Sequence, residues 1–482
     1  MDKYFRYEEQ EIEIKLNGEK VNGYMIREFE INSDVNKHTE IKIVFEVAEN
    51  SKSKYEEANQ IEDCALEVNA VKNGSESQKI NIFTGQIKDS CFKVYGNNGY
   101  QYSLVGYSKS ELIDRERKYR VFQDVNLTYE EIIMEIISEY KDKKIEVVMN
   151  KKVKGKIGDI IFQFDETDYE FLVRLISHLN MGIINTDAGV LSFGFTDAGE
   201  SKNEDMIHAN YGIMRKGKDI IYRIESSQIF NNGNTIAIEI NNGKNEFKIK
   251  KTKIYVDRGL LFSEYEMVSE NYEMPKILNE KIKGSVIEGI VEKVFEKNNI
   301  AVMNIRFYEG LSKYGKAYKD YGILRYTVPY STFYSQTNTG FFCTPEVNDV
   351  VDVFFLSNQE KFLRASGSVN NPGNGRFSDY TKRNFHVNQN DFNFKLDLNN
   401  FDLKTASKYT VESPNIAKIG DNLVNKATKN LIMASDDYLG IESIGSADFY
   451  ASKIDMIGKE KDITIESMSS DVRMKGKKVH SN

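Results

Sequence analysis

The side chains whose type and spacing suit acid–base chemistry are two carboxylates, Glu166 and Asp168. Two nearby carboxylates with diverging pKa values can cleave a glycosidic bond, one as general acid and the other as base or nucleophile. Both residues lie where a helix is predicted to begin, and the helix dipole and unpaired amides stabilise negative charge there. This structural role needs no substrate, so we predict no catalytic residue in the chain.

Metal binding is the second chemistry to consider, and the sequence gives no ligand pattern for it. His178 has no second histidine one helical turn away and no cysteine nearby, so we expect it to pack at a helix surface or an interface. Cys64, Cys91 and Cys343 are too scattered for a disulfide framework or a zinc site. We predict buried free thiols, no metal and no cofactor.

Four cations that could bind phosphate precede the first predicted helix: Arg115, Arg117, Lys118 and Arg120. Asp114, Glu116 and Asp124 flank them, which predicts a solvated or subunit-bridging salt-bridge network. The chain carries a formal charge of -8, whereas binding to nucleic acid needs an excess of cations. We therefore exclude nucleic acid as a partner.

Aromatic residues later in the chain could stack on a ligand: Tyr326, Tyr330, Phe333 and Tyr334. Small β-barrels can bind oligonucleotides or oligosaccharides on such a face. Carbohydrate binding is therefore kept as an alternative to a purely structural role.

The elements that position these residues follow from hydrophobic periodicity. Residues 11–16 and 41–47 alternate apolar and polar side chains, which indicates half-buried strands. Two helices should begin at capping boxes, in which a Thr and a Glu three residues later satisfy the first backbone donors, at Thr128 and at Thr167. Residues 180–182 (NMG) should end the second helix, with the glycine near its C-cap. The apolar stripes are Ile132, Ile133, Ile136, Ile137 and Tyr140, then Phe171, Leu172, Leu175, Ile176 and Leu179.

The second half of the chain differs in composition and period. All five prolines follow residue 274, which predicts a domain boundary near 275–285. Short apolar strands within 286–355 then suit a small barrel. Residues 370–375, with the sequence NNPGNG, favour turns and should close it.

Beyond this linker, pairs of apolar residues recur with one polar residue between them. Strands this short cannot bury themselves alone, which predicts a β-solenoid of intertwined copies, with three chains directing their apolar side chains toward a common axis. An ordinary antiparallel domain is the alternative. The pairs are Leu396 with Leu398, Leu431 with Met433, Leu439 with Ile441, Ile454 with Met456, Ile463 with Ile465, and Val472 with Met474.

Length and composition are those of a folded multidomain chain. A length of 482 residues suits about three domains, and 40% hydrophobic with 29% charged residues argues against disorder. The charged N-terminus, and the lack of any stretch of about 18 apolar residues, predict neither a signal peptide nor a membrane-spanning helix.

Three stretches, in the same order along the chain, resemble the VgrG and phage late control D family. Residues 112–124 (LIDRERKYRVFQD) are similar to the family's basic segment, which ends in a Phe-Gln-Asp-like triplet before a helix. Residues 163–175 (QFDETDYEFLVRL) resemble its helix motif, with Tyr169 in place of the usual Trp. Residues 340–371 are similar to its barrel, which ends in a Gly-Ser-Val-Tyr-Asn-like turn, although Asn370 replaces the aromatic residue.

The resemblance implies a mainly β fold with a few helices. Its α+β hub would have two barrel-like domains, at residues 1–110 and 181–284, with a helical insert at 111–180. An OB-fold barrel at 285–370 would follow, and then a linker and a trimeric β-helix spike at 371–482.

The resemblance also implies a non-enzymatic structural protein, the baseplate hub and cell-puncturing central spike of a contractile injection system. Phage tails, R-type bacteriocins and type VI secretion systems share this hub. The implied partners are two further copies in a homotrimer, the inner tail tube protein, baseplate wedge proteins, a separate PAAR-like spike-tip protein, the tape measure protein and, on contraction, the target cell envelope. Such a chain would be made in the bacterial cytoplasm and assembled into a virion or tail-like particle. The alternatives are a tail-associated peptidoglycan hydrolase and a carbohydrate-binding baseplate module.

Overall fold

The chain divides into two units, Met1–Tyr380 and Thr381–Asn482. Among the described helices, none combines the length and the apolar composition that crossing a membrane requires. The computed structural model describes residues 10–480 apart from residues 23, 73–78, 97–98, 187–188, 196–201, 208–209, 227, 231, 241–242, 309–318, 323, 334, 337–338, 341–343, 369–382, 388–391, 397–398 and 406.

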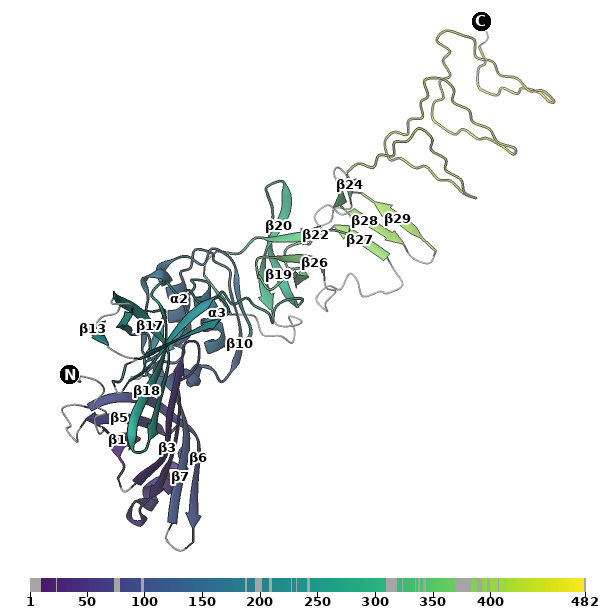
Figure 1. The fold of residues 1–482 in the computed structure, drawn as a ribbon. Coiled ribbons are helices and arrows are strands. Elements are labelled where there is room, and N and C mark those ends of the chain that lie inside the picture. Colours follow the sequence, from purple (N-terminus) through teal and green to yellow (C-terminus); the bar gives the residue numbers. More distant parts are fainter. Residues whose placement is uncertain are drawn as a thin grey trace. The chain divides into compact units, whose positions relative to one another are not determined.

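Strands from two distant parts of the first unit share one 13-stranded sheet (Figure 1). They are β1 (Gln10–Leu16), β2 (Glu19–Lys20), β3 (Tyr24–Asp34), β4 (Glu40–Val47), β5 (Ala65–Lys72), β6 (Lys79–Tyr95), β7 (Gly99–Ser108), β13 (Lys202–Ile207), β14 (Tyr211–Lys216), β15 (Asp219–Ser226), β16 (Thr235–Ile240), β17 (Gly243–Asp257) and β18 (Leu260–Ser269). The main path is β14-β15-β18-β17-β3-β4-β7-β6-β5-β1-β2, and β16 joins β13 to β17. Antiparallel pairing of β17 with β3 joins the two parts, so the segments predicted as separate barrel-like domains form one continuous sheet.

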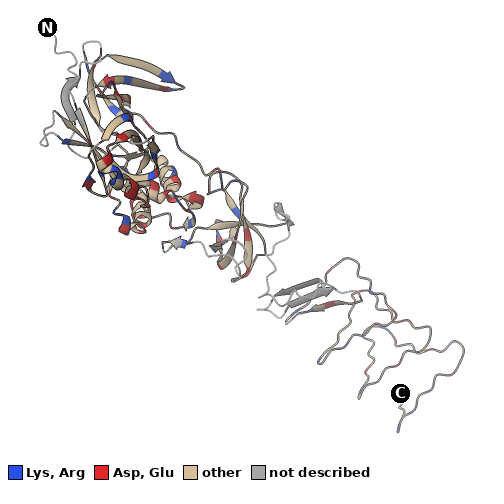
Figure 2. Cartoon of the chain, turned by 90° about the horizontal axis from the view of Figure 1, so that it is seen from below, with Lys and Arg blue, Asp and Glu red and all other residues tan. Residues whose placement is uncertain are grey.

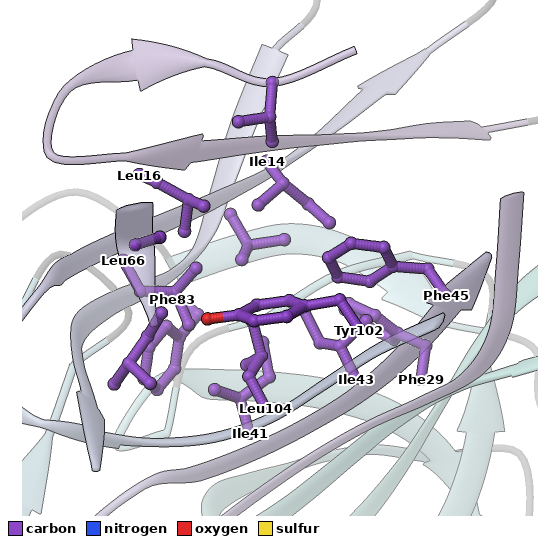
Figure 3. Close-up of a cluster of buried hydrophobic side chains, with 14 of the residues drawn as sticks. Ile14, Leu16, Phe29, Ile41, Ile43, Phe45, Leu66, Phe83, Tyr102 and Leu104 are labelled. Carbon is purple, nitrogen blue, oxygen red and sulfur yellow. The ribbon is translucent and has the colours of Figure 1, made fainter. Parts of the chain in front are cut away.

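The first core packs on one face of this sheet (Figure 3). Ile41, Ile43 and Phe45 of β4 are fully buried because alternate side chains of a strand point to the same face. Helix α1 (Lys52–Ala58) adds Tyr55, whose ring centroid lies 5.1 Å from that of Phe45 and 5.3 Å from that of Tyr102. The strands predicted at residues 11–16 and 41–47 are confirmed.

Two helices and two small sheets enclose the second core. Helices α2 (Tyr129–Ser138) and α3 (Asp168–Ser177) begin at the predicted capping boxes, since the hydroxyls of Thr128 and Thr167 accept hydrogen bonds from the amides three residues later. The sheets consist of β8 (Arg117–Phe122), β10 (Ile161–Thr167) and β21 (Lys319–Tyr321), and of β9 (Val147–Met149), β11 (Ile183–Asn185) and β12 (Leu191–Phe193). Short 3-10 turns lie at Glu49–Ser51, Lys109–Ile113, Lys141–Lys143 and Lys151–Lys154.

The predicted apolar stripes are buried within both helices. Tyr140 and Leu179, predicted as the last members of each stripe, lie beyond the helix ends and are half-buried. Asn180 has a left-handed φ of 58° just after α3. The helix therefore ends in the predicted segment 180–182, but Asn180 rather than Gly182 takes the left-handed conformation, which asparagine tolerates.

A small closed barrel confirms the barrel predicted for the second half of the first unit. Its strands are β19 (Val286–Lys297), β20 (Ile300–Tyr308), β22 (Val328–Ser331), β25 (Val350–Phe355) and β26 (Leu363–Ser368). They close in the order β19-β20-β22-β26-β25, and of these pairs only β22 with β26 is parallel. The short strands β23 (Ser335–Gln336) and β24 (Thr339–Gly340) pair with each other.

The second unit contains a three-stranded sheet of β27 (Arg383–Val387), β28 (Phe392–Leu396) and β29 (Phe401–Lys404). Residues 407–480 follow as a trace with repeated outward and returning segments (Figure 1). They form no helix or strand in the single chain, and every one of them is exposed. The strands predicted at the pairs from Leu431 to Met474 are therefore absent here, because one chain gives their backbone no ladder partner. Leu396 ends β28, whereas Leu398 lies outside the described residues.

Candidate functional site

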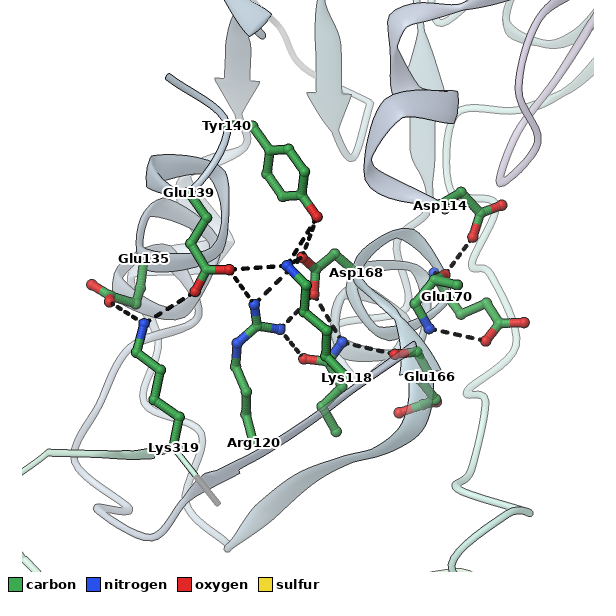
Figure 4. Close-up of polar contacts among 12 residues, drawn as sticks. Asp114, Lys118, Arg120, Glu135, Glu139, Tyr140, Glu166, Asp168, Glu170 and Lys319 are labelled. Carbon is green, nitrogen blue, oxygen red and sulfur yellow. Dashed lines mark hydrogen bonds and ion pairs between the residues drawn. The ribbon is translucent and has the colours of Figure 1, made fainter. Parts of the chain in front are cut away.

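A buried ionic network joins β8 to both helices (Figure 4). Asp168, the first residue of α3, is fully buried and accepts hydrogen bonds from Arg120 at 2.5 Å and Lys118 at 2.9 Å. The Tyr140 hydroxyl donates to the same carboxylate at 2.7 Å. Arg120 also donates to Glu139 at 2.6 Å, so two anions balance the two cations.

This network fixes the charge state of its members. Burial raises the pKa of the Asp168 carboxyl, but the contacts with Arg120 and Lys118 outweigh burial and lower that pKa below its ordinary value. Burial and the neighbouring carboxylate raise the pKa of Tyr140 to about 12. A carboxylate held ionised between cations does not exchange protons near neutral pH, so the geometry gives Asp168 a structural role.

A bulge in β10 positions the second carboxylate, that of Glu166. Between Gln163 and Glu166, β10 contains one residue more than β8, and Asp165 takes a left-handed φ of 51° there. The bulge places Glu166 on the same face as Gln163. On that face Arg174 of α3, which is 2% exposed, donates to both oxygens of Glu166 at 2.7 Å.

Arg174 also connects this region to the barrel. Its second terminal nitrogen donates at 2.9 Å to Glu360, in the loop between β25 and β26. Asn279, in the segment that leads to the barrel, donates to Glu360 at 3.1 Å and to the Phe162 carbonyl at 3.3 Å. A helix, a strand, a connecting segment and a barrel loop therefore meet at one buried guanidinium.

The Phe-Gln-Asp triplet at residues 122–124 makes the second attachment to the barrel region. Phe122 stacks on Tyr321 of β21, with ring centroids 4.8 Å apart. Gln123 donates to the Ile305 carbonyl of β20 at 3.1 Å. Asp124 accepts from the Leu324 amide at 3.4 Å. We call the contacts of Arg174, Glu360, Asn279 and residues 122–124 the junction.

His178 lies next to the junction as the residue that caps the end of α3. It borders a cavity of about 110 Å³ together with Asp159, Lys276 and Glu360. Burial, with repulsion from Lys276 and Arg174, lowers the pKa of His178 to about 3, so the ring is neutral. In the part of the chain that the structure describes, no cluster of three or more His, Cys, Asp or Glu side chains could hold a metal ion.

The two carboxylates considered as an acid–base pair have separate partners, since Asp168 pairs with Arg120 and Lys118 while Glu166 pairs with Arg174. The cation cluster forms a salt-bridge network, but its centre at Arg120 and Asp168 is buried within one chain rather than solvated. The anions of this buried centre are Glu139 and Asp168 rather than the flanking Asp114, Glu116 and Asp124. Arg115 lies outside this network, and its guanidinium is 2.6 Å from the Asp63 carboxylate.

Sequence reasoning missed four residues of this region, namely Glu139, Asn279, Glu360 and Lys319. Lys319 of β21 lies 3.0 Å from Glu139 and so extends the ionic network of Figure 4. The Arg174 and Glu360 partners are 186 residues apart in the chain. No spacing rule connects residues at such distances, and a lone Glu in a loop gives no signal of its own.

The prediction of buried free thiols needs correction. Cys64 is buried, and burial raises the pKa of its thiol, but Cys91 is exposed, contrary to the expectation of buried thiols. Cys91 lies in the part of β6 beyond the pairing with β5, where the strand is covered less. Cys343 is outside the described residues.

The aromatic residues predicted as a stacking surface divide between two places. Tyr330 and Phe333 line a hollow of about 960 Å³ on the barrel. Tyr326 instead packs against the barrel core, and its amide donates to Gln123. Tyr334 lies outside the described residues. Around the helices, Lys and Arg are interspersed with Asp and Glu rather than gathered into a patch of one sign (Figure 2).

Solved structures with the same fold are tail-related proteins. The E. coli c3393 protein, a component of the type VI secretion system with structural similarity to the bacteriophage T4 tail proteins gp27 and gp5, matches with a TM-score of 0.51 at 12% identity, over 74% of this chain and 99% of its own. A chain of the lidded Francisella PdpA-VgrG complex matches with a TM-score of 0.53 at 10% identity, over 84% of this chain and 78% of its own. No protein-family profile and no curated protein sequence matches the chain. At these identities the likeness shows the fold, and it confirms the family resemblance at that level.

Proposed function

We propose that this chain, which has the fold of VgrG-like and tail hub proteins, is the non-enzymatic hub-and-spike subunit of a contractile injection apparatus. Three copies would form a hub on the inner tube and a needle that punctures the target envelope. The ion pairs support a structural role, since Asp168, Glu166 and Glu360 are held by buried arginines rather than aimed at a substrate site.

The observation that carries the proposal is the exposure of residues 407–480. Ile463 and Ile465, for example, are 46% and 57% exposed, and the polar Thr464 lies between them. Monomers rarely expose apolar side chains along such a length. Three intertwined copies would bury these pairs along a common axis and pair their backbones, which supports a trimeric β-helix.

The large sheet supplies a second argument for several copies. Strand β14 ends the path of the sheet, and its Ile213 is 61% exposed. Strand β6 extends beyond its pairing with β5. Among the described residues, its segment from Asp89 to Tyr95 pairs only with β7. Pairing β14 of one copy with this part of β6 in the next would join three sheets into a ring and cover these two exposed edges.

The barrel and the junction fit the same role. A five-stranded closed barrel supports the OB-fold assignment. A buried ion pair to the loop between β25 and β26 and a side-chain hydrogen bond to β20 would hold the barrel rigidly when the particle contracts. We further propose that the hub seats on the tube protein and wedge proteins, and that a separate tip protein covers the needle. The Francisella relative, by its name, also forms a complex with another protein, PdpA.

The test is the mass of the purified full chain by light scattering, compared with 55.4 kDa for one copy. We expect three times that mass. Ile465→Lys should shift the protein to monomers, because a charge would enter the proposed axis. Glu466→Lys is the matched control on the adjacent residue, and it should remain trimeric because its side chain would point outward.

A monomeric wild-type chain that stays monomeric when mixed with its tube protein would contradict the proposal. Equal dissociation by both substitutions would instead show that residues 463–466 do not alternate between an axial and an outer face.

A further inference from the structure

The barrel carries an exposed hollow that the proposed hub role does not use. Its volume is about 960 Å³, and it is lined by the end of β22, the start of β20 and the loop between β25 and β26. We infer that this hollow binds an oligosaccharide that bears a carboxylate. The inference depends only on residues of the barrel, so its failure would leave the proposed trimer untouched.

Exposed apolar side chains gather around the hollow. Phe333 is 91% exposed and Phe362 50%, while Ile300 and Leu356 are 54% and 55% exposed. None of these four side chains belongs to the barrel's core, although Leu363 and Tyr330 of the lining border that core. An exposed apolar group of this kind on a soluble domain marks a binding surface, and aromatic faces can stack on the apolar face of a sugar ring.

Polar side chains lie among the aromatic ones. Asn299, Thr332 and Lys361 line the hollow and can donate hydrogen bonds to hydroxyl groups. A mixed lining of aromatic faces and a few polar groups is typical of small-ligand sites. Five-stranded barrels of this class bind oligomeric ligands beside their second and third strands and the adjoining loops, which here are β20, β22 and the loops at 298–299 and 356–362.

Arg364 indicates the charge of the ligand. It lines the hollow, is exposed, and has no ion-pair partner among the described residues. Lys361, by contrast, lies 3.7 Å from Asp159 and 5.5 Å from the Phe362 ring centroid. The planar fork of Arg364 suits a carboxylate. Two cations are too few for the phosphate contacts of a nucleic-acid strand, and this favours a sugar ligand.

Calorimetric titration of the full chain tests this inference. The probe is a tetrasaccharide of alternating N-acetylglucosamine and N-acetylmuramic acid, compared with neutral chitotetraose and with a single-stranded oligothymidylate. We expect the acidic sugar to bind more tightly than the neutral one. Phe333→Ala and Phe362→Ala should each weaken binding by about fivefold to tenfold through lost stacking.

Matched variants separate the hollow from other surfaces. Arg364→Gln should remove the preference for the acidic sugar and leave the affinity for chitotetraose unchanged. Phe401→Ala, at a 60% exposed phenylalanine of the second unit, should have no effect. Absence of binding to either sugar, equal loss with Phe401→Ala, or binding of the oligothymidylate alone would each overturn the inference.

Discussion

At the scale of the residue, Arg174 is the side chain on which most contacts converge. It is buried between Glu166 and Glu360, and its removal would leave two carboxylates buried without a cation. We expect Arg174→Met to lower the free energy of unfolding by about 3–5 kcal/mol. Urea unfolding followed by circular dichroism would measure this change.

Arg117 provides the control for Arg174. It also pairs with carboxylates near α3, but its side chain is 48% exposed. Arg117→Met should therefore cost less than about 1 kcal/mol. Similar losses for the two variants would show that the junction contributes no more than a surface ion pair.

His178 predicts a pH dependence. Its pKa falls from about 6.5 in the unfolded chain to about 3 in the folded one. Between these values the unfolded chain binds more protons, so stability is fully present above pH 6.5 and decreases as the pH falls toward 3. We expect a loss on the order of 1–2 kcal/mol between pH 6.5 and 4.5 that His178→Gln abolishes. The same change in the free energy of unfolding between pH 6.5 and pH 4.5 for the wild type and for His178→Gln would contradict this.

The residues of the junction show how far sequence reasoning reaches. Glu166 and Asp168 are recognisable as special from their position at a helix start, and their structural role follows from the same position. The longer-range contacts are not recognisable from sequence. Arg120 reaches Asp168 only through the pairing of distant strands. Glu360 reaches Arg174, the partner of Glu166, from a barrel loop far away in the sequence.

At the scale of the element, the two capping boxes offer a direct comparison. Thr128 and Thr167 cap α2 and α3 in the same way, but the Thr167 hydroxyl also hydrogen-bonds Asp114 and is more buried. We expect Thr128→Ala to cost about 1 kcal/mol and Thr167→Ala about 2 kcal/mol. Thermal unfolding of both variants would test this order, and a larger loss with Thr128→Ala would refute the role of Asp114.

Element prediction succeeded where the signal was local. The alternation in β1 and β4 and the capping boxes of α2 and α3 each lie within a few residues, and the elements form as expected. Pairing between distant strands gave no such signal. The pairing of β17 with β3 unites two segments predicted to be separate, and β21 leaves the barrel region to pair with β8.

At the scale of the whole molecule, the proposed trimer predicts protection of the C-terminal segment from proteolysis. Lys453, Lys459 and Lys461 are exposed in the single chain. In a trimer the paired backbone around them should resist trypsin, whereas the Ile465→Lys variant should be cut there within minutes. Mass spectrometry of a digestion time course would show the difference. Equal rates of cleavage would mean that this backbone is not paired in the assembly.

The exposure of residues 407–480 also bears on how the protein is made. A segment without backbone partners in its own chain cannot complete its structure on the ribosome or at high dilution, however stable the finished particle is. In the proposed trimer its ordering would be a reaction between chains, so its rate should increase with concentration, while the sheet and barrel of the first unit would fold at a rate independent of it. Supply of the chain would then decide when needles appear in the cell, and a shortage would leave folded first units that carry unfinished tails.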